Sequence, residues 1–425
     1  MRARSLDDAV GTLKRDIGKD SREIQDFLVK MLRIEAVNPK VGGPGEGERA
    51  NLLEGFMKDE GFSVTRVDVR DEKSHGALRP NLSAKLEGKD PSRNLWFVTH
   101  MDTVPEGSLD LWETDPFEPT IKEGKIIARG ADDNGQSLVA SLFALREIRD
   151  LDVPLPFNVG VWLVSDEEFG NTCGIKHLLA HGYFRKNDLV IAADAGTAAG
   201  TDIEVAEKSL LWFKVTTRGR EVHASLPRKG VNAHRIGMKL ALDLDESLSG
   251  KYQYSDPLFD EPLSTFEPTK KEANVSNVNT IPGEDAFYFD CRLLPRYSLD
   301  GLLADVQTKI DEYQERYGVS ISMEVVEKEP AGPATPEDSE IAVLLARAIR
   351  LVSNVRPRFI GIGGQTVGNL FRRDGIPTAV WSKVDDVAHE PNEYALVENL
   401  LNDTKVFAAL PFFANSFHLA DQTPR

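Results

Sequence analysis

The pattern of hydrophobic and polar positions predicts an α/β protein. Apolar residues recur at helical spacing after Asp20 and again after Glu48, so each stretch predicts a helix with one buried face. Short apolar runs rich in β-branched residues follow, and their alternation with helical stretches predicts a sheet covered on both faces. The predicted helices are Asp20–Arg33, Glu48–Asp59 and Gly135–Ile148, and the predicted strands are Phe62–Val67, Leu82–Leu86, Leu95–Thr99, Phe157–Val164 and Leu189–Ala193.

The pattern changes after about residue 205, where strands and helices form a compact set resembling β-α-β-β-α-β. A chain of 425 residues is too long for one core, so two domains are expected. We predict a first domain built from residues 1–205 and 329–425, interrupted by a smaller domain at 206–328. The insert contains predicted strands at Leu210–Thr217, Asp285–Leu294 and Ser320–Val326 and helices at Asn232–Leu248 and Leu299–Tyr317; a Pro- and Gly-rich linker, Glu327–Asp338, precedes Ser339–Val352 and Thr378–Trp381.

Composition and charge narrow the classes of function. The chain is 41% hydrophobic and 28% charged, it has no apolar run of bilayer length, and its first residues lack the apolar stretch of a signal peptide, which favours a cytoplasmic protein. A formal charge of −17 argues against nucleic acid and against an anionic membrane surface as partners. Cys173 and Cys291 are too few for a disulfide framework, so we expect buried thiols.

Five short segments place metal-ligand side chains after apolar runs. Strand ends in an open α/β sheet meet at a crevice, where ligands collect. Imidazole and carboxylate together suit zinc, or manganese and cobalt, and an Asp shared by two ions would hold them roughly 3.5 to 4 Å apart. Each segment alone has a structural explanation as a turn or a solvated loop, but five in order favour a two-metal hydrolase. They are Thr99-His100-Met101-Asp102, Ala131-Asp132-Asp133-Asn134-Gly135, Asp166-Glu167-Glu168, Ala193-Asp194-Ala195 and Ala388-His389-Glu390.

These motifs resemble a known family, the two-zinc amidohydrolases that include aminoacylase, succinyl-diaminopimelate desuccinylase, acetylornithine deacetylase and glutamate carboxypeptidase. The resemblance covers nearly the whole chain. It implies two divalent ions, with zinc favoured and cobalt or manganese as alternatives. It assigns His100 and Asp194 to one ion, Glu168 and His389 to the other, and Asp132 to the bridging position.

The same resemblance implies roles for neighbouring residues. Asp102 would orient His100, Glu167 would act as the general base, and a cis peptide would follow the bridging residue, between Asp132 and Asp133. The implied fold is a zinc-peptidase-like catalytic domain with a mixed sheet between helices, interrupted by a ferredoxin-like α+β lid and dimerisation domain.

The insert carries three further residues that match the family. His223, in Gly219-Arg220-Glu221-Val222-His223, is similar to the His that reaches across a dimer to polarise the scissile carbonyl. Asn279 and Arg292 match residues that hold the free carboxylate of the substrate, which a guanidinium can grip with two hydrogen bonds. Without the resemblance, Arg292 could equally be a solvated charge or a salt-bridge partner, Asn279 a turn residue and His223 a surface histidine. A homodimer through the insert is therefore expected.

The chain departs from the family pattern at three places. Asp133-Asn134-Gly135 replaces the usual Met-Lys-Gly or Asp-Lys-Gly, and Gly363-Gly364-Gln365-Thr366 replaces the usual Gly-Gly-Thr-Asp. Lys383 stands where relatives usually have a Gly-Pro-Gly turn; contact with a substrate and a solvent-facing position are its two interpretations, and we favour solvent. Substrate specificity cannot therefore be transferred from any one member.

We predict hydrolysis of an amide bond next to a free carboxylate, in an N-acyl amino acid or a small peptide. Succinyl-diaminopimelate desuccinylation and other deacylations are one group of candidates, and dipeptidase or carboxypeptidase activity is the alternative. A metal-binding relative without turnover would have lost Glu167 or a ligand, and all of these are present. A two-zinc aminopeptidase of a related fold would lack the insert with His223 and Arg292.

Overall fold

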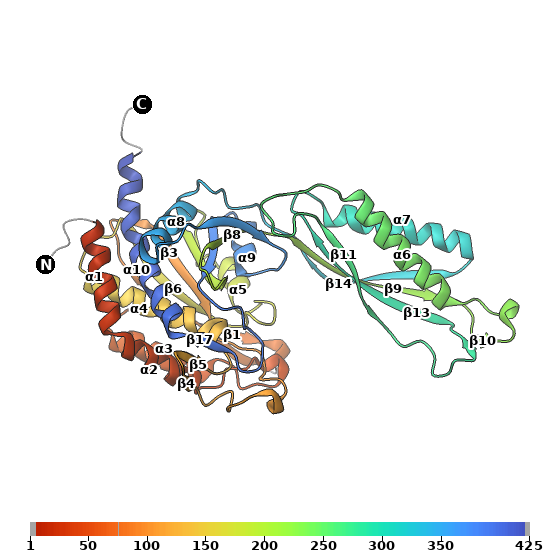
Figure 1. The fold of residues 1–425 in the computed structure, drawn as a ribbon, viewed down its shortest axis with the longest axis horizontal. Helices are drawn as coiled ribbons and strands as arrows, with labels where there is room; N and C mark the ends of the chain where they lie inside the picture. Colours follow the sequence, from red (N-terminus) through yellow and green to blue (C-terminus); the bar gives the residue numbers. More distant parts are fainter. Residues whose placement is uncertain (1–5, 75, 421–425) are drawn as a thin grey trace. The chain divides into compact units, whose positions relative to one another are not determined.

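The computed structural model describes residues 6–74 and 76–420, which form two compact units (Figure 1). The large unit comprises Met1–Val205, Ala334–Phe359 and Thr366–Arg425, and the insert unit comprises Ala206–Pro333 and Ile360–Gln365. The predicted insert ended at residue 328, whereas the insert unit continues to Pro333 and also takes in Ile360–Gln365, the segment that contains Gln365.

A mixed eight-stranded sheet runs through the large unit in the order β1-β2-β6-β3-β7-β16-β8-β15. The four strands β6, β3, β7 and β16 pair in parallel, and the pairs β1-β2, β2-β6 and β16-β8 are antiparallel. The predicted α/β class with a mixed sheet is thus confirmed. The strands are β1 Val64–Asp71, β2 Ala77–Leu86, β3 Asp90–His100, β6 Phe157–Val164, β7 Leu189–Gly196, β8 Asp202–Glu207, β15 Arg358–Ile362 and β16 Thr378–Ser382.

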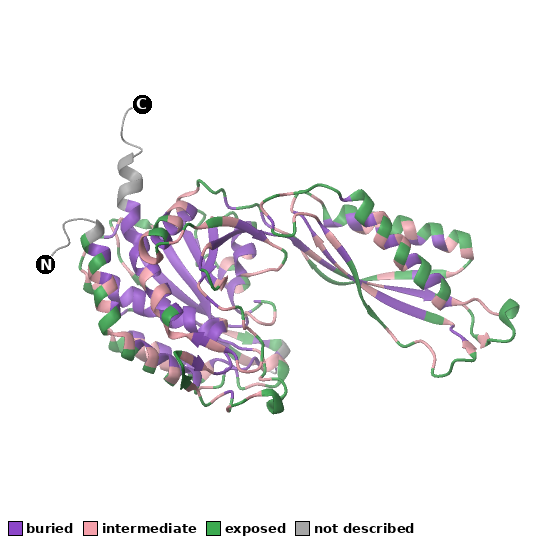
Figure 2. Cartoon of the chain, in the orientation of Figure 1, coloured by how far each residue is buried: buried purple, intermediate pink, exposed green. Residues whose placement is uncertain are grey.

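Helices cover both faces of this sheet, and the central strand β6 is accordingly buried along its whole length (Figure 2). Because side chains alternate along a strand, Trp96 and Val98 of β3 pack with α5 and α9, whereas the Phe97 ring lies 5.0 Å from that of Phe407 in α10. α10 also packs against α4 and α8. The helices are α1 Leu6–Lys19, α2 Ser21–Leu32, α3 Gly47–Asp59, α4 Gln136–Asp150, α5 Ile175–Ala180, α8 Glu340–Ser353, α9 Val367–Arg373 and α10 Val397–Ala420.

Short elements bring two distant segments together. Tyr394 of β17 pairs with Ile127 of β5 in a small three-stranded sheet, so the chain after His389 runs beside the chain that leads into the Asp132-Asp133 turn. These elements are β4 Thr120–Lys122, β5 Lys125–Ile127 and β17 Tyr394–Leu396, with short helical turns at Pro39–Val41, Glu72–Ser74, Leu109–Leu111, Ala131–Gly135 and, in the insert, Pro227–Lys229.

The insert unit is a four-stranded antiparallel sheet in the order β11-β13-β9-β14, packed against two helices. The side chains of Asn232 and Ser298 cap the two helices by accepting from Arg235 N and Gly301 N. Chain order and sheet order together give the ferredoxin-like arrangement that was predicted. The elements are β9 Ser209–Arg218, β10 Val222–His223, α6 Ala233–Lys251, β11 Thr265–Lys271, β12 Thr280–Ile281, β13 Glu284–Leu293, α7 Leu299–Tyr317 and β14 Ser320–Glu329.

One strand of the four-stranded insert sheet, β11, had no predicted residues. β11 lies at the sheet edge, and the last five of its seven residues are exposed, so the alternation that reveals a half-buried strand is absent. β14 extends to Glu329, so the predicted linker begins inside a strand. Among the described residues, no helix combines the length and apolar character needed to cross a bilayer. The cytoplasmic location stays a prediction.

Candidate metal centre

The ends of three parallel strands bring acidic and imidazole side chains to one edge of the large sheet. β3 ends at His100, which is in register with Val164 at the end of β6, and Glu167 and Glu168 come three and four residues after that strand end. Asp194 lies near the end of β7, the neighbour of β3 on its other side. The parallel register therefore gathers side chains from positions up to 94 residues apart in the sequence.

Two groups of ligand side chains adjoin at this edge, and they share one carboxylate. The first contains His100, Asp133 and Asp194, and the second contains Asp133, Glu168 and His389. His100 Nε2 lies 2.7 Å from Asp133 Oδ1, and His389 Nε2 lies 3.1 Å from Asp133 Oδ2. The two oxygens of Asp133 thus face two different imidazoles, which is the arrangement of a carboxylate that bridges two ions.

The remaining distances complete each group. His100 Nε2 is 3.2 Å from Asp194 Oδ1, and His389 Nε2 is 3.2 Å from Glu168 Oε2. Glu168 Oε1 is buried and has no hydrogen-bond partner within the part of the chain that the structure describes. A buried oxygen without a donor is costly unless a cation satisfies it, so the residues present fit divalent metal ions.

The electrostatics of both groups favour a cation. Hydrogen bonds that the His389 imidazole donates to Asp133 and Glu168 raise the pKa of His389 to about 10. Burial alone would lower the pKa of His100, but Asp133 and Asp194 raise it well above its usual value. Burial also raises the pKa of Glu168, and the charge of Asp133 adds to that effect. The clustered carboxylates therefore stabilise positive charge between them, whether it comes from protons or from metal ions.

Four of the five predicted ligands meet in these groups, and the fifth, Asp132, does not. Asp132 belongs to neither group, and its Oδ2 accepts a hydrogen bond from Val387 N at 3.2 Å. The residue common to both groups is Asp133, one residue after the Asp132 that the sequence suggested for the bridging position. The cis peptide is likewise one residue later than predicted, between Asp133 and Asn134. Two adjacent aspartates have identical side chains, so no spacing in the sequence distinguishes them.

Asp102 connects the end of β3 to the loop after β6. Its Oδ1 accepts from Glu167 N at 2.9 Å, and its Oδ2 accepts from Glu168 N at 3.3 Å and from Asn38 Nδ2 at 2.8 Å. His100 Nδ1 lies 3.0 Å from the backbone oxygen of Asp102 and 3.7 Å from its carboxylate. The residue predicted to orient His100 thus does so chiefly through its backbone, while its carboxylate positions the two glutamates.

A fully buried arginine, Arg79, lies near Asp102, and no motif in the sequence pointed to it. Arg79 forms ion pairs with Glu46, Asp71 and Asp166, and its Nη2 is 3.9 Å from Asp102 Oδ2. Charges buried to this extent need partners of opposite sign, and this network supplies them. Its members come from four separate regions of the sequence, so only the folded chain reveals the set.

Glu167 lies beside the first group without belonging to it. With His100 and Asp194 it lines a narrow pocket at the end of β3. Burial, together with the nearby charge of Asp194, raises the pKa of Glu167 well above its usual value. Asn171 Nδ2 lies 3.3 Å from Glu167 Oε1, a contact that limits the orientations of the carboxylate. A carboxylate with a raised pKa accepts a proton more readily, as a general base must.

The three predicted substrate residues lie in the insert unit. His223 and Asn279 are on neighbouring segments, because Ala224 N donates to Asn279 O at 2.8 Å; both residues are exposed. His223 Nδ1 is 2.7 Å from Ser225 Oγ. Arg292 is held by Asp290, two residues earlier on β13, through Nε at 2.7 Å and Nη2 at 3.0 Å. The arginine predicted to grip a carboxylate therefore already binds one from its own strand.

The departures from the family pattern have structural partners. Gln365 Nε2 donates to Lys208 O at 2.7 Å within the insert unit. The Lys383 side chain is 20% exposed, and its Nζ lies 3.8 Å from Glu398. It is therefore neither in a ligand group nor fully in solvent.

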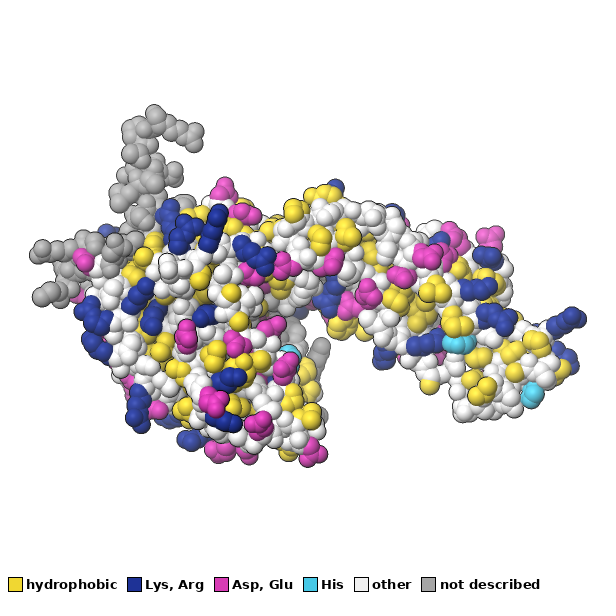
Figure 3. Space-filling view, viewed as in Figure 1, with side chains coloured by type: hydrophobic (Ala, Val, Ile, Leu, Met, Phe, Trp, Pro, Cys, Tyr) yellow, Lys and Arg dark blue, Asp and Glu magenta, His cyan; other side chains and the backbone are white. Residues whose placement is uncertain are grey.

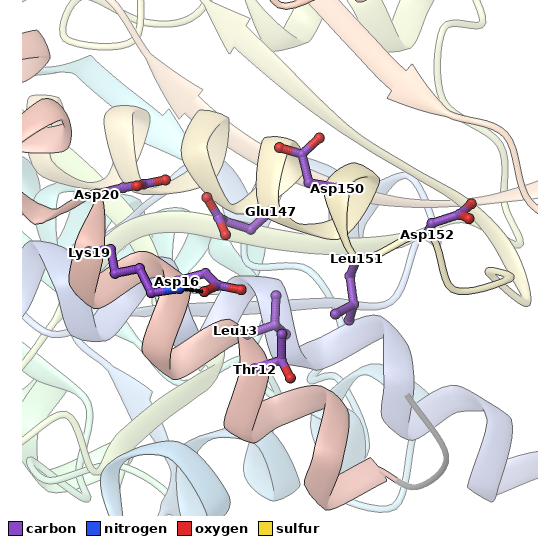
Figure 4. Close-up of a pocket in the computed structure, with 9 residues that line it drawn as sticks. All are labelled: Thr12, Leu13, Asp16, Lys19, Asp20, Glu147, Asp150, Leu151 and Asp152. Atoms are coloured by element: carbon purple, nitrogen blue, oxygen red, sulfur yellow. Dashed lines mark hydrogen bonds and ion pairs between the residues drawn. The ribbon is translucent and has the colours of Figure 1, made fainter. Parts of the chain in front are cut away.

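A separate cavity of about 490 Å³ lies between α1 and the end of α4, and it contains none of the ligand side chains above (Figure 4). Its lining includes Asp16, Asp20, Glu147 and Asp150. Arg146 forms ion pairs with both Asp20 and Glu147, so part of this acidic lining is already neutralised.

The sheet and the two adjoining ligand groups define a metal-dependent hydrolase. The chain belongs to peptidase family M20/M25/M40, whose family model matches residues 96–411, and the resemblance inferred from the motifs is confirmed. It is accordingly a hydrolase that acts on C–N bonds with divalent metal ions.

Individual relatives agree with this placement. The chain is 36% identical over 401 residues to an uncharacterized metallohydrolase of Methanococcus maripaludis, covering 89% of this chain and 95% of the relative. It is 28% identical over 393 residues to succinyl-diaminopimelate desuccinylase of a Sulfurovum species, covering 90% of this chain and 97% of that relative. Its fold matches human carnosine dipeptidase 1 with a TM-score of 0.73 at 20% identity, over 95% of this chain and 98% of that one.

Proposed function

We propose that the protein hydrolyses an amide bond next to a free carboxylate, in an N-acyl amino acid or a small peptide. The observation that carries this proposal is the placement of Asp133, whose two carboxylate oxygens face His100 and His389 separately. A shared carboxylate is the feature that separates a two-ion centre from two unrelated sites. We further propose zinc as the metal, because imidazole and carboxylate ligands in sets of three suit that ion.

The chemistry supplied by bound ions is polarisation of the substrate carbonyl and a lowered pKa of water. Glu167 takes the proton from the attacking water and passes it to the leaving amine, since it lies beside the first ligand group without belonging to it. Asp102 fixes the backbone of Glu167 and Glu168, so base and ligand keep their relative positions. Adjacent residues can have these different roles because their side chains point in different directions.

The insert supplies the proposed substrate contacts. His223 donates a hydrogen bond to the oxygen that gains negative charge, and Asn279 and Arg292 hold the free carboxylate of the substrate. Asp290 already binds the guanidinium of Arg292 at two nitrogens, so it would fix the orientation of this side chain. Arg292 Nη1, which donates to Gly363 O at 3.1 Å, is the nitrogen that Asp290 does not occupy.

The first test is hydrolysis with and without metal. We expect zinc- or cobalt-loaded protein to release amine from one class among N-succinyl, N-acetyl and N-formyl amino acids and dipeptides. Removal of the ions by a chelator should reduce turnover by about 100-fold or more, because both carbonyl polarisation and water activation are lost. Restored turnover on adding zinc or cobalt back distinguishes loss of metal from loss of fold.

The panel also separates the alternatives. Cleavage of N-acyl amino acids alone supports a deacylase, and cleavage of dipeptides alone supports a dipeptidase of the same family. Turnover that a chelator leaves unchanged would contradict the proposed mechanism. Protein that binds two ions but leaves the whole panel intact would instead indicate the non-catalytic relative.

We propose that two chains pair through α6 and β11 of the insert unit. β11 is an edge strand with one unpaired side, and such an edge can accept another strand. On α6 beside it, Met238 is 45% exposed and Leu242 is 64% exposed. Acidic and basic side chains are interspersed over the face of the chain drawn in Figure 3. Exposed apolar residues next to a free edge support pairing there.

The molar mass in solution tests this pairing. Light scattering should give twice the chain mass of 47.1 kDa for the unaltered protein and a single chain mass for Leu242→Glu, because a buried carboxylate would be unpaired at the interface. Val326→Glu adds the same charge on β14 at the opposite edge of the sheet and should leave the dimer intact. A monomeric unaltered protein, or dissociation by Val326→Glu alone, would contradict the assignment.

A further inference from the structure

The side chain of Glu393 fixes the turn that carries the shared ligand Asp133. Glu393 is 1% exposed, and its Oε1 accepts from Asp132 N at 2.9 Å and from Asp133 N at 3.0 Å. Its Oε2 accepts from Gly130 N at 3.1 Å and from Arg129 Nη1 at 2.6 Å. A carboxylate offers about four acceptor positions, so this one is fully used in holding one turn.

The same turn also holds the loop that carries His389. Asp132 Oδ2 accepts from Val387 N at 3.2 Å, two residues before His389. Arg129 Nη2 donates to the backbone oxygen of His389 at 3.3 Å. Each segment therefore holds the backbone of the other beside its metal ligand, although the two lie about 260 residues apart.

The loop needs such contacts because its backbone is in an unfavourable region. Asp386, His389 and Asn392 have φ values of 57°, 64° and 61°, the left-handed region that residues other than glycine rarely adopt. The His389 side chain is 54% exposed, so packing alone does little to fix it. Conformations of this kind persist only where the surrounding structure holds them.

The contacts act unequally on the two ligand groups. Asp133 and His389 both belong to the second group, which is completed by Glu168. The first group takes His100 and Asp194 from the ends of β3 and β7, whose positions the sheet itself sets. Loss of the contacts should therefore displace two of three ligands in the second group but only one in the first.

We propose that Glu393 and Asp132 are positioning residues that form a reciprocal lock, which sets the distance between Asp133 and His389 and so the affinity of the second group for its ion. The inference rests on the proposed two-ion function. It also gives Asp132, which the sequence suggested as a ligand, a different role.

Zinc titration of metal-free protein, followed by calorimetry and by measured metal content, tests the lock. Glu393→Gln should lower the affinity of the second group for its ion about 10- to 100-fold, because an amide nitrogen would face backbone N–H donors. The affinity of the first group should stay within about threefold of that of the unaltered protein. Glu398→Gln removes the same charge five residues later from a side chain that is 87% exposed, and should bind both ions as the unaltered protein does. Cobalt absorption spectra report the geometry of the two ions independently of activity.

Two variants of Asp132 provide a second, milder test should Glu393→Gln fail to fold. Asp132→Asn keeps an oxygen that can accept from Val387 N and should bind both ions normally, whereas Asp132→Ala loses that acceptor and should weaken the second ion about tenfold. A purely structural role would instead weaken both ions equally in the alanine variant. Equal weakening, or unchanged binding in both Glu393→Gln and Asp132→Ala, overturns the lock. Unaltered protein that binds fewer than two ions overturns the proposed function instead.

Discussion

Replacing Glu167 by Gln should lower kcat by roughly 10² to 10⁴-fold and leave the binding of both ions nearly unchanged. The amide keeps the size of the side chain but cannot accept the proton of the attacking water. Neither ligand group contains Glu167, so the metal content should stay at the level of the unaltered protein. Turnover of the best substrate from the panel and metal analysis of the same sample measure the two halves of this prediction.

A matched substitution and the metal content give this experiment its controls. Glu118→Gln makes the same chemical change at a side chain that is 70% exposed, and it should leave kcat unaltered. If Glu167→Gln loses an ion, the carboxylate of Glu167 acts as a metal ligand in the unaltered protein. Should it keep full turnover, another group would be the base.

Replacing Asp133 by Asn should abolish turnover and lower the affinity for both ions by more than about 100-fold. This loss exceeds the usual effect of changing a residue that only contacts a ligand. Asp133 is the only residue common to both groups of the described chain, and each of its oxygens faces a different imidazole. The amide loses the negative charge and one of the two oxygens. Zinc titration should therefore show two weakened sites. Substitution of a ligand that belongs to only one group should weaken one site.

The neighbouring aspartate is the control for this experiment. Asp132→Asn makes the same change one residue earlier, and we expect it to retain both ions because its amide oxygen can still accept from Val387 N. The opposite result, with both ions lost in Asp132→Asn and kept in Asp133→Asn, would restore the assignment first suggested by the sequence.

Local sequence pattern predicted the elements that carry most of the site. The run Leu95–Thr99 predicted a strand, and β3 ends at His100. The buried run Phe157–Val164 is β6 with the predicted bounds, so Glu167 and Glu168 had to follow a strand end. These predictions succeeded because a strand buried on both faces needs a continuous apolar run, and such a run is visible without knowledge of its neighbours. β11 was missed because an exposed edge strand has no such requirement.

Contacts between distant segments escaped prediction. Arg79 forms ion pairs with Glu46 before β1, Asp71 within β1 and Asp166 after β6. The sequence around position 79 does not predict these partners. The bond between Asp290 and Arg292 is different, since residues two apart on a strand share a face, and the sequence alone could have suggested it. The distinction lies in whether the partner is fixed by local geometry or by the packing of the whole sheet.

The sequence by itself determined the class of fold, because hydrophobic periodicity is a local property of the chain, and its motifs indicated the family. Those motifs also named four of the five residues that form the two candidate ligand groups, namely His100, Glu168, Asp194 and His389. Only the tertiary structure decided which of two adjacent aspartates is shared between the ligand groups. That choice depends on the orientation of the peptide groups in one turn, and the carboxylate of Glu393, about 260 residues away, holds those groups by accepting from their N–H donors.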